Sequence, residues 1–326
     1  MIPPANKFQR IACMAVTTLA IAAVSLCFGA EPVIEIVNPH HRKDFSSIQS
    51  AVDAAAKGKA GIFKIEIQPG RYHEAVTIPL MAAHMILKGV GNSPAAVWIG
   101  AGKGRHTLTV HAANFMAENF TVENTAGPTA GPQNAIYMDG RHQIFDHVDI
   151  KGWQDTLAIW NGCTSYFTHC RISGSVDFIY SGGTAYFSHC AIIQRRRIGG
   201  VNCAPSTPKN VRYGFIFHRC WITCRRGVAR NSSALMRPWR PYGMAAYINC
   251  TMADHINRAG WSKWGGREKT CRAIEFGSRR PDGKLINLAE RAPWVKRITS
   301  EQARSYTLKH VFQHWNPQAV LQAIAR

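Results

Sequence analysis

A short segment recurs six times in the middle of the chain, and this repeat limits the possible folds more than any other feature. In each copy an aromatic or apolar residue leads into polar residues, and a small apolar residue and then an aliphatic residue follow. The matched positions are Phe120, Val148, Cys170, Cys190, Cys220 and Cys250. A period of about 20–30 residues predicts a solenoid in which each repeat forms one coil.

We therefore predict an all-β fold, a single-stranded right-handed parallel β-helix (solenoid) with short helices at the ends. A β-sandwich is the alternative, but its hairpins would recur about every 8–12 residues. A helix starting near Phe45 is expected to close the N-terminal end, because Ser46 and Gln49 form a capping-box pattern. Short helices are also expected at residues 300–310 and 317–325, either at the far end or along the flank.

The N-terminus has the layout of a secretory signal peptide. Lys7 and Arg10 precede a mostly apolar run from Ile11 to Ala30, and Pro32 follows. This predicts a signal peptide over residues 1–30 and a single β-helix domain over residues 31–326. The protein would then be secreted, either extracellular or periplasmic, with no stable membrane association. The apolar run is also long enough to span a bilayer as an uncleaved anchor.

The chain is strongly basic, with a formal net charge of +20 that becomes +18 without the two cations of the leader. A predominantly positive electrostatic field around the protein indicates an acidic partner such as nucleic acid, an anionic membrane or an acidic polysaccharide. No nucleic-acid recognition motif is present, so we predict no nucleic-acid partner. The alternative is a solvated basic surface without a specific role.

Eight cysteines follow the leader, and an exported protein is able to form disulfides. Cys170 and Cys190 are one coil apart, so they form either a disulfide or two steps of an inward apolar ladder. No CxxC pair and no tight His/Asp cluster occurs, so we predict no metal site and regard most histidines as surface or core residues.

Two aspartates, Asp155 and Asp177, each lie inside an apolar, β-prone run, and the interval between them matches one coil of the solenoid. On a coil of that length they would stack at about the 4.8 Å strand spacing. Two carboxylates so close do not both ionise easily, and a charged carboxylate beside a neutral one suits covalent and acid/base chemistry. The alternative is that both aspartates cap turns.

Five stretches of the chain resemble motifs of the pectin methylesterase (pectinesterase) family and occur in the family's order. They are residues 70–74, Gln133, the Gln-Asp-Thr-Leu run at 154–157, the Asp-Phe-Ile-Tyr run at 177–180, and the Arg-Pro-Trp run at 237–239. The resemblance extends over about residues 33–317. Met236, Ser181 and Cys203 depart from the family pattern, and the first two are expected to border the site and reshape its cleft.

The resemblance implies a catalytic domain that hydrolyses galacturonate methyl esters of pectin, without a cofactor or a metal. Asp177 would be the nucleophile, Arg237 its partner, and Asp155 the general acid and then base. Gln133 and Gln154 would form the oxyanion hole, unless they form a polar ladder along the stack. Arg237 would otherwise be a solvated surface residue.

Aromatic side chains are expected to line a sugar cleft, because pyranose faces stack on aromatic rings. The candidates are Tyr137, Trp153, Tyr180, Trp239 and Trp261. Tyr137 is as well suited to the core. The expected partner is an acidic polysaccharide, methylated pectin, and the expected state is a monomer. Two alternatives are a β-helix esterase or thioesterase that acts on another acyl ester, and a non-catalytic polysaccharide-binding protein.

Overall fold

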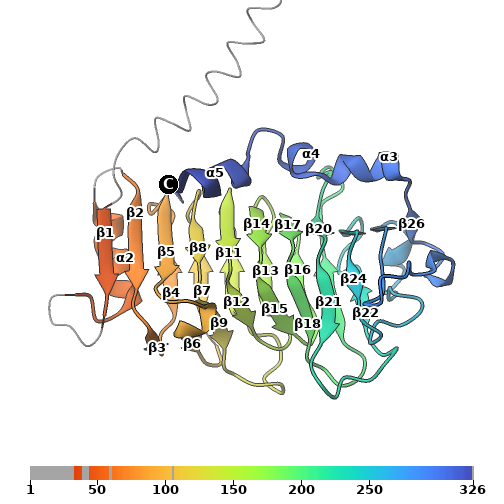
Figure 1. Cartoon of the computed structure of the whole chain (residues 1–326), viewed down its shortest axis with the longest axis horizontal. Helices are drawn as coiled ribbons and strands as arrows, with labels where there is room; N and C mark the ends of the chain where they lie inside the picture. The colour runs from red at the N-terminus through yellow and green to blue at the C-terminus, as the bar shows by residue number, and fades with distance from the viewer. Residues whose placement is uncertain (1–32, 39–43, 59–60, 105, 325–326) are drawn as a thin grey trace, which may run out of the picture.

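A computed structural model describes residues 33–38, 44–58, 61–104 and 106–324. Within these ranges the strands form three parallel sheets of eleven, eight and seven strands, which we call sheets A, B and C. Successive coils add strands to the sheets along the long axis, and the three sheets enclose one core (Figure 1). The predicted parallel β-helix is confirmed. The expected signal peptide lies outside the described residues, and within them no helix is both long and apolar enough to cross a membrane.

Sheet A consists of β1 (Val33–Val37), β2 (Phe63–Ile67), β5 (Met85–Gly89), β8 (Met116–Glu118), β11 (Gln143–Asp146), β14 (Thr164–Thr168), β17 (Thr184–Ser188), β20 (Phe215–His218), β23 (Met244–Ile248), β25 (Arg272–Phe276) and β26 (Lys296–Arg297). Sheet B consists of β3 (Gly70–Tyr72), β6 (Val97–Ala101), β9 (Thr121–Asn124), β12 (Asp149–Lys151), β15 (Arg171–Gly174), β18 (Ala191–Gln194), β21 (Trp221–Cys224) and β24 (Thr251–Met252). Sheet C consists of β4 (Val76–Ile78), β7 (Leu108–Val110), β10 (Ile136–Met138), β13 (Leu157–Ile159), β16 (Val176–Ser181), β19 (Val201–Pro205) and β22 (Ala234–Met236).

The core is built from ladders of like residues on successive coils. Phe145, Phe167 and Phe187 stack with ring centroids 4.8 Å apart at each step. Such stacking follows from the strand spacing, because an inward residue at the same place on each coil meets its equivalents above and below. The repeat positions found in the sequence are all buried here, and Cys170 and Cys190 are among them. Both are free thiols, so the disulfide alternative is wrong and the apolar ladder is correct.

The helix α2 (Ile48–Lys57) closes the N-terminal end of the core, as predicted. Its N-cap is Ser47, which accepts a hydrogen bond from the backbone N–H of Ser50, and not the predicted Ser46. The expected capping box does not form, because the Glu74 carboxylate instead accepts the backbone N–H groups of Ile48 and Gln49 at 2.9 and 3.0 Å. The negative charge of Glu74 there also suits the positive end of the helix dipole.

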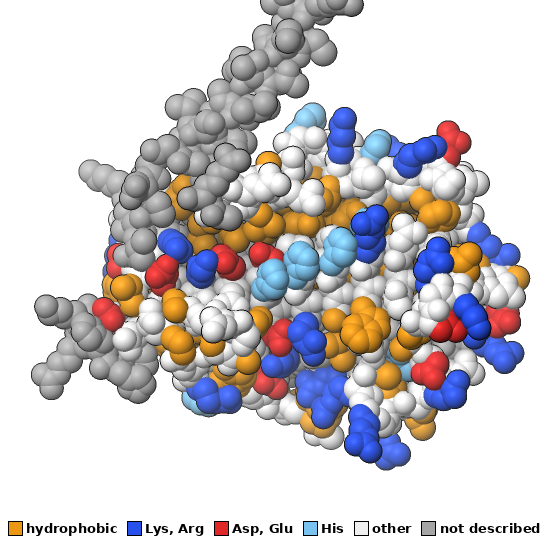
Figure 2. All heavy atoms as spheres, in the orientation of Figure 1, with side chains coloured by type: hydrophobic (Ala, Val, Ile, Leu, Met, Phe, Trp, Pro, Cys, Tyr) orange, Lys and Arg blue, Asp and Glu red, His pale blue; other side chains and the backbone are white. Residues whose placement is uncertain are grey.

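The C-terminal helices lie along the flank of the solenoid, on the outer face of sheet A (Figure 1). They are α3 (Ser300–Ala303), α4 (Leu308–Phe312) and α5 (Pro317–Ile324). Single turns of 3-10 helix occur at η1 (Pro94–Ala96), η2 (Arg267–Lys269), η3 (Leu288–Glu290) and η4 (Arg304–Tyr306). An apolar band under the helices is visible in Figure 2, and Phe312 packs there on Tyr186. The helices thus bury a second apolar surface that strands alone would leave in water.

Candidate active site

The two aspartates occupy equivalent places on successive coils of sheet C. Leu157 of β13 pairs with Ile179 of β16, so Asp155 and Asp177 each lie two residues before a paired position. The backbone N–H of Asp155 donates to the carbonyl of Val176 at 3.1 Å, which joins the two coils at this point. Both aspartates adopt the left-handed region, with φ of 59° and 50°. Aspartate is one of the few residues that tolerates this conformation, which turns the chain sharply beside the strand.

Arg237 holds Asp177 by a two-pronged ion pair. Its Nε donates to Asp177 Oδ1 at 2.8 Å and its Nη2 donates to Oδ2 at 2.6 Å. Arg237 directly follows β22, and Asp177 is 5% exposed. Charge-assisted pairs of this geometry are strong and fix orientation. The Trp264 ring also contacts Arg237, because the guanidinium carbon of Arg237 lies 4.1 Å from the ring centroid.

The two carboxyl groups differ in their electrostatic surroundings. Burial raises the pKa of Asp155 to about 7, the negative charge of Asp177 adds to this rise, and the charge of Arg237 opposes it. Burial also raises the pKa of Asp177, but there the hydrogen bonds and charge of Arg237 act against the rise. Asp177 therefore has a direct cationic partner for its ionised form, whereas Asp155 takes up a proton near neutral pH.

The two glutamines of the predicted site are also coil neighbours. The backbone N–H of Gln133 donates to the carbonyl of Gln154 at 3.1 Å. The side-chain oxygen of Gln133 accepts the backbone N–H of Gly104 at 2.9 Å. Because this bond uses the side-chain oxygen of Gln133, the group that Gln133 offers to a ligand is its side-chain amide N–H. Both side chains are partly exposed.

Three of the predicted aromatic residues lie on or beside the outer face of sheet C. Tyr137 pairs with Ala158, which pairs with Tyr180, so a small residue separates two tyrosines along one outward row. Tyr137 is partly exposed between two buried neighbours and does not belong to the core. Trp239 meets the Tyr180 ring edge-on at a centroid distance of 5.9 Å. Together these side chains form an aromatic surface next to the carboxylates.

Trp153 is partly exposed in the turn before β13. The guanidinium carbon of Arg195 lies 4.0 Å from the centroid of its ring, and Arg195 Nη1 donates to the carbonyl of Gly152 at 2.7 Å. One face of this indole is therefore covered by a cation, a cation–π contact.

Trp261 was the wrong choice as a cleft residue. It is 3% exposed, its indole N–H donates to Glu275 at 3.2 Å, and its ring meets Tyr247 edge-on in the core. Trp264, three residues later, is the tryptophan that reaches the arginine of the site. Sequence reasoning missed Trp264 because it lies in the same segment as Trp261, and only the inward or outward direction of each ring separates them.

Asn134 is a second residue that sequence reasoning missed. Its side-chain amide donates to the backbone carbonyl of Asp155 at 2.5 Å and to the Tyr180 hydroxyl at 3.1 Å. Asn134 therefore connects the turn that carries Asp155 to the aromatic surface. Its position directly after Gln133 was the available signal.

Met236 and Ser181 do not line the site, contrary to expectation. Both are fully buried, and Met236 belongs to the core cluster. Ser181 adopts a φ of +88°, a conformation that glycine takes without strain. A residue other than glycine is strained at this φ, so the Ser181 departure affects the backbone, and its buried side chain does not reach the groove.

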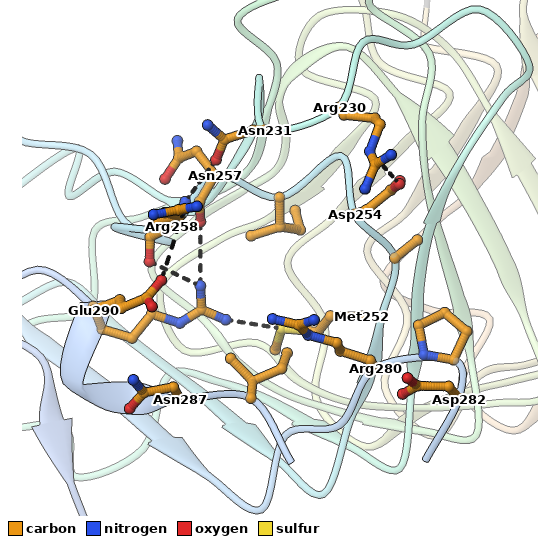
Figure 3. Close-up of a pocket in the computed structure, with 15 residues that line it drawn as sticks. Arg230, Asn231, Met252, Asp254, Asn257, Arg258, Arg280, Asp282, Asn287 and Glu290 are labelled. Carbon is orange, nitrogen blue, oxygen red and sulfur yellow. Dashed lines mark hydrogen bonds and ion pairs between the residues drawn. The ribbon is translucent and has the colours of Figure 1, made fainter. Parts of the chain in front are cut away.

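A separate hollow of about 580 Å³ lies toward the C-terminal end of the solenoid and shares no residue with the carboxylate site (Figure 3). Its polar groups largely satisfy one another. Arg230 pairs with Asp254 at 2.8 Å, and Arg291 donates to the backbone carbonyls of Asn257 and Arg258. None of the carboxylates, glutamines or the arginine of the site on sheet C is among the residues that line this hollow.

Fold and site together define a parallel β-helix protein that carries two adjacent carboxyl groups and an arginine on one sheet. Residues 35–314 match the pectinesterase family, and the chain belongs to that family. It is 29% identical over 281 residues to a probable pectinesterase/pectinesterase inhibitor 23 of Arabidopsis thaliana, covering 81% of this chain and 49% of that protein. It is 27% identical over 260 residues to pectinesterase 2 of Citrus sinensis, covering 76% of this chain and 51% of that protein. The chain thus spans about half the length of the curated relatives it matches.

Solved structures with the same fold agree with this assignment. A pectin methylesterase from Yersinia enterocolitica is 29% identical, with a TM-score of 0.71 over 83% of this chain and 99% of that chain. Pectin methylesterase PemA from Erwinia chrysanthemi is 26% identical, with a TM-score of 0.74 over 88% of this chain and 98% of that chain. The pectin methylesterase from carrot, 24% identical with a TM-score of 0.81 over 91% and 97%, matches in fold.

Proposed function

We propose that this protein hydrolyses the methyl esters of galacturonate units in pectin and releases methanol and free carboxylate. The observation that carries the proposal is the pairing of unlike carboxyl groups: Asp177 is held by Arg237, while Asp155 has a pKa of about 7. Membership of the pectinesterase family supports the same chemistry. A solved structure of a pectin methylesterase in complex with a hexasaccharide, 26% identical to this chain, supports an oligosaccharide substrate.

In the first half of the proposed reaction, an oxygen of ionised Asp177 attacks the ester carbonyl carbon. The carbonyl oxygen becomes an oxyanion, which the amide donors of Gln133 and Gln154 stabilise. Protonated Asp155 then gives its proton to the methoxy oxygen, and methanol leaves. The product is an acyl-enzyme anhydride between Asp177 and the galacturonate.

In the second half, Asp155 is ionised and takes a proton from a water molecule. The hydroxide attacks the acyl carbon, and the bond to Asp177 breaks. This restores ionised Asp177 and protonated Asp155 and releases the galacturonic acid, whose proton passes to solvent. Each residue returns to its starting state, so no cofactor is needed for the balance of atoms and protons.

We also infer how the sugar chain is bound and where the protein acts. The outward row of Tyr137 and Tyr180, together with Trp239, offers aromatic faces on which pyranose rings stack. The net charge, +20 for the full sequence and +18 without the leader, suits an acidic polysaccharide. Export by residues 1–30, secretion as a monomer made of residues 31–326, and the lack of a nucleic-acid partner stay predictions.

The test is methanol release from highly methylated pectin by residues 31–326, compared with Asp177→Asn. Asparagine tolerates the left-handed backbone of this position, so the variant removes the nucleophile with little strain. We expect methanol release to fall to background. Asp254→Asn is the matched control, because Asp254 is an aspartate whose carboxylate pairs with Arg230 at the separate hollow.

Three outcomes would contradict the proposal in different ways. An unchanged rate in Asp177→Asn would refute the nucleophile. Binding of methylated pectin without methanol release by the unaltered protein would indicate a non-catalytic polysaccharide-binding protein. Faster hydrolysis of simple acyl esters or thioesters than of pectin would indicate an esterase of another specificity.

A further inference from the structure

Two ladders of polar side chains run side by side along the turns between sheets A and B. The strand-ending residues Asp146, Thr168 and Ser188 are paired in register. The residue after each is a histidine, and these histidines, His147, His169 and His189, all have φ between 52° and 53°. Their rings stack with centroid distances of 4.8 and 5.8 Å. Figure 2 shows this row of histidine side chains on the surface below the apolar band.

In each turn the histidine Nδ1 faces the side-chain oxygen of the preceding residue. The distances are 2.7 Å from His147 to Asp146 Oδ1, 3.1 Å from His169 to the Thr168 hydroxyl, and 2.9 Å from His189 to the Ser188 hydroxyl. His169 Nδ1 also lies 3.7 Å from Asp146 Oδ1. Two imidazole nitrogens from adjacent coils thus converge on one carboxylate oxygen.

That carboxylate oxygen is poorly satisfied. Asp146 Oδ1 is buried and has no hydrogen bond of acceptable geometry, although the His147 nitrogen is close. The nearest acidic residue along the same ladder, Glu118, is already paired with Lys88 at 2.7 Å. A buried carboxylate oxygen without a donor is costly unless a cation or a proton compensates it.

We propose that Asp146, His147 and His169 form a surface site for a divalent transition-metal ion such as Zn²⁺. In the described part of the chain, they are the one group of three His, Cys, Asp or Glu residues whose ligand atoms lie within 4.8 Å of one another. Zinc takes imidazole nitrogen and carboxylate oxygen at about 2.0–2.2 Å, which places tetrahedral ligands about 3.4 Å apart. The distances of 2.7 and 3.7 Å bracket that value.

The site needs only small side-chain movements to bind the ion. The side chains of His147 and His169 are 55% and 53% exposed, so the stacked rings are free to tilt toward each other. Solvent would supply the fourth ligand. Imidazole favours zinc, copper and nickel, whereas calcium and magnesium prefer oxygen ligands. The ion would join two successive coils at a corner of the solenoid away from sheet C, so it would stabilise the fold without taking part in the reaction.

The sequence by itself had predicted no metal site in this protein. His147 and His169 are a whole coil apart in the chain and therefore match no short metal-binding motif. The coil length brings them together in the same way as the two catalytic aspartates.

The experiment is a calorimetric titration of the full mature protein with Zn²⁺ at pH 7.5, with Mg²⁺ as the comparison ion. We expect the unaltered protein to bind Zn²⁺ at this site, and His169→Asn to weaken that binding at least about tenfold. Asparagine is the appropriate replacement, because Asn119 and Asn249 occupy the equivalent turns of other coils with φ of 58° and 55°. Asp146→Asn should weaken binding as well.

His189→Asn is the matched control. It removes a histidine of the same ladder, in the same backbone conformation, whose Nδ1 faces a serine hydroxyl instead of the carboxylate. Zinc should raise the unfolding temperature of the unaltered protein and of His189→Asn, but not that of His169→Asn. Unfolding temperatures without zinc check that each variant is folded.

The proposal is overturned if the unaltered protein binds no Zn²⁺ at millimolar concentration. It is also overturned if His169→Asn binds as tightly as the unaltered protein, or if His189→Asn loses as much affinity as His169→Asn. The last two results would place the bound ion on other histidines or on thiols.

Discussion

Replacing Asp155 by asparagine should make the protein more stable and less active, and the gain in stability should depend on pH. The pKa of this carboxyl group rises from its ordinary 3.8 to about 7 in the folded protein, chiefly because of burial. The folded state therefore holds the proton more tightly than the unfolded chain does. Folding stability consequently falls as pH rises from about 4 to about 7 and stays lower above that range.

The magnitude follows from the size of the pKa change. A rise from 3.8 to about 7 corresponds to about 4 kcal/mol at 1.36 kcal/mol per pKa unit, and this is an upper bound because Asp155 is partly exposed. Asparagine resembles the protonated carboxyl group and tolerates the φ of 59°. The variant should thus gain up to about 4 kcal/mol of unfolding free energy at pH 8 and almost nothing at pH 4.

The assay is urea unfolding of both proteins at pH 4, 6 and 8, together with methanol release. Loss of the general acid should lower the rate by about 10²- to 10⁴-fold. A variant that is destabilised at pH 8, or stabilised equally at pH 4 and pH 8, would refute the inference that ionisation of Asp155 lowers the unfolding free energy. Normal activity with the predicted gain in stability would refute only its role as the acid.

Three further predictions concern the arginine, the tryptophans and the thiols. Arg237→Lys should lower kcat/KM about 10- to 100-fold at pH 7. The reason is that an ammonium group does not reproduce the two guanidinium hydrogen bonds to the carboxylate, and a hydrogen bond to a charged group is worth about 1.5–3 kcal/mol. An unchanged kcat/KM would mean that only the positive charge matters. Trp261→Ala should lower the unfolding free energy by about 3–5 kcal/mol, because Trp261 is a core residue. Trp239→Ala should instead raise KM at nearly unchanged stability. The reverse pattern would mean that Trp239 is the core residue and Trp261 the substrate-binding one. Thiol titration of the unfolded mature protein should find Cys190 and the other seven cysteines reduced. A reductant should leave the unfolding temperature unchanged. Detection of a disulfide would contradict the ladder of free thiols.

The sequence was sufficient to predict the features that repeat with the coil. The matched positions from Phe120 to Cys250 are buried as expected. Asp155 and Asp177 are at equivalent places on successive coils, because the interval between them equals the interval between the paired strand residues Leu157 and Ile179. A parallel solenoid converts a constant interval in the chain into neighbours in space, so periodicity alone carries this information.

The sequence was not sufficient where the chain leaves the repeat. Trp261 and Trp264 both lie in the long segment between β24 and β25. The motif did not indicate that the first enters the core beside Met236 while the second contacts Arg237. The predicted capping box of Ser46 and Gln49 does not form for a similar reason, because Glu74 comes from another coil and accepts the backbone N–H of Gln49.

By itself the sequence determined the solenoid, the ladder of apolar residues, and the two carboxylates together with the arginine that follows a later strand. Only the tertiary structure decided the electrostatic difference between Asp155 and Asp177, the free state of the stacked thiols, and the convergence of His147 and His169 on Asp146. The physical reason is that strand spacing and register are local and repeated. Burial, side-chain direction and charge contacts instead depend on every coil and loop that packs around a residue.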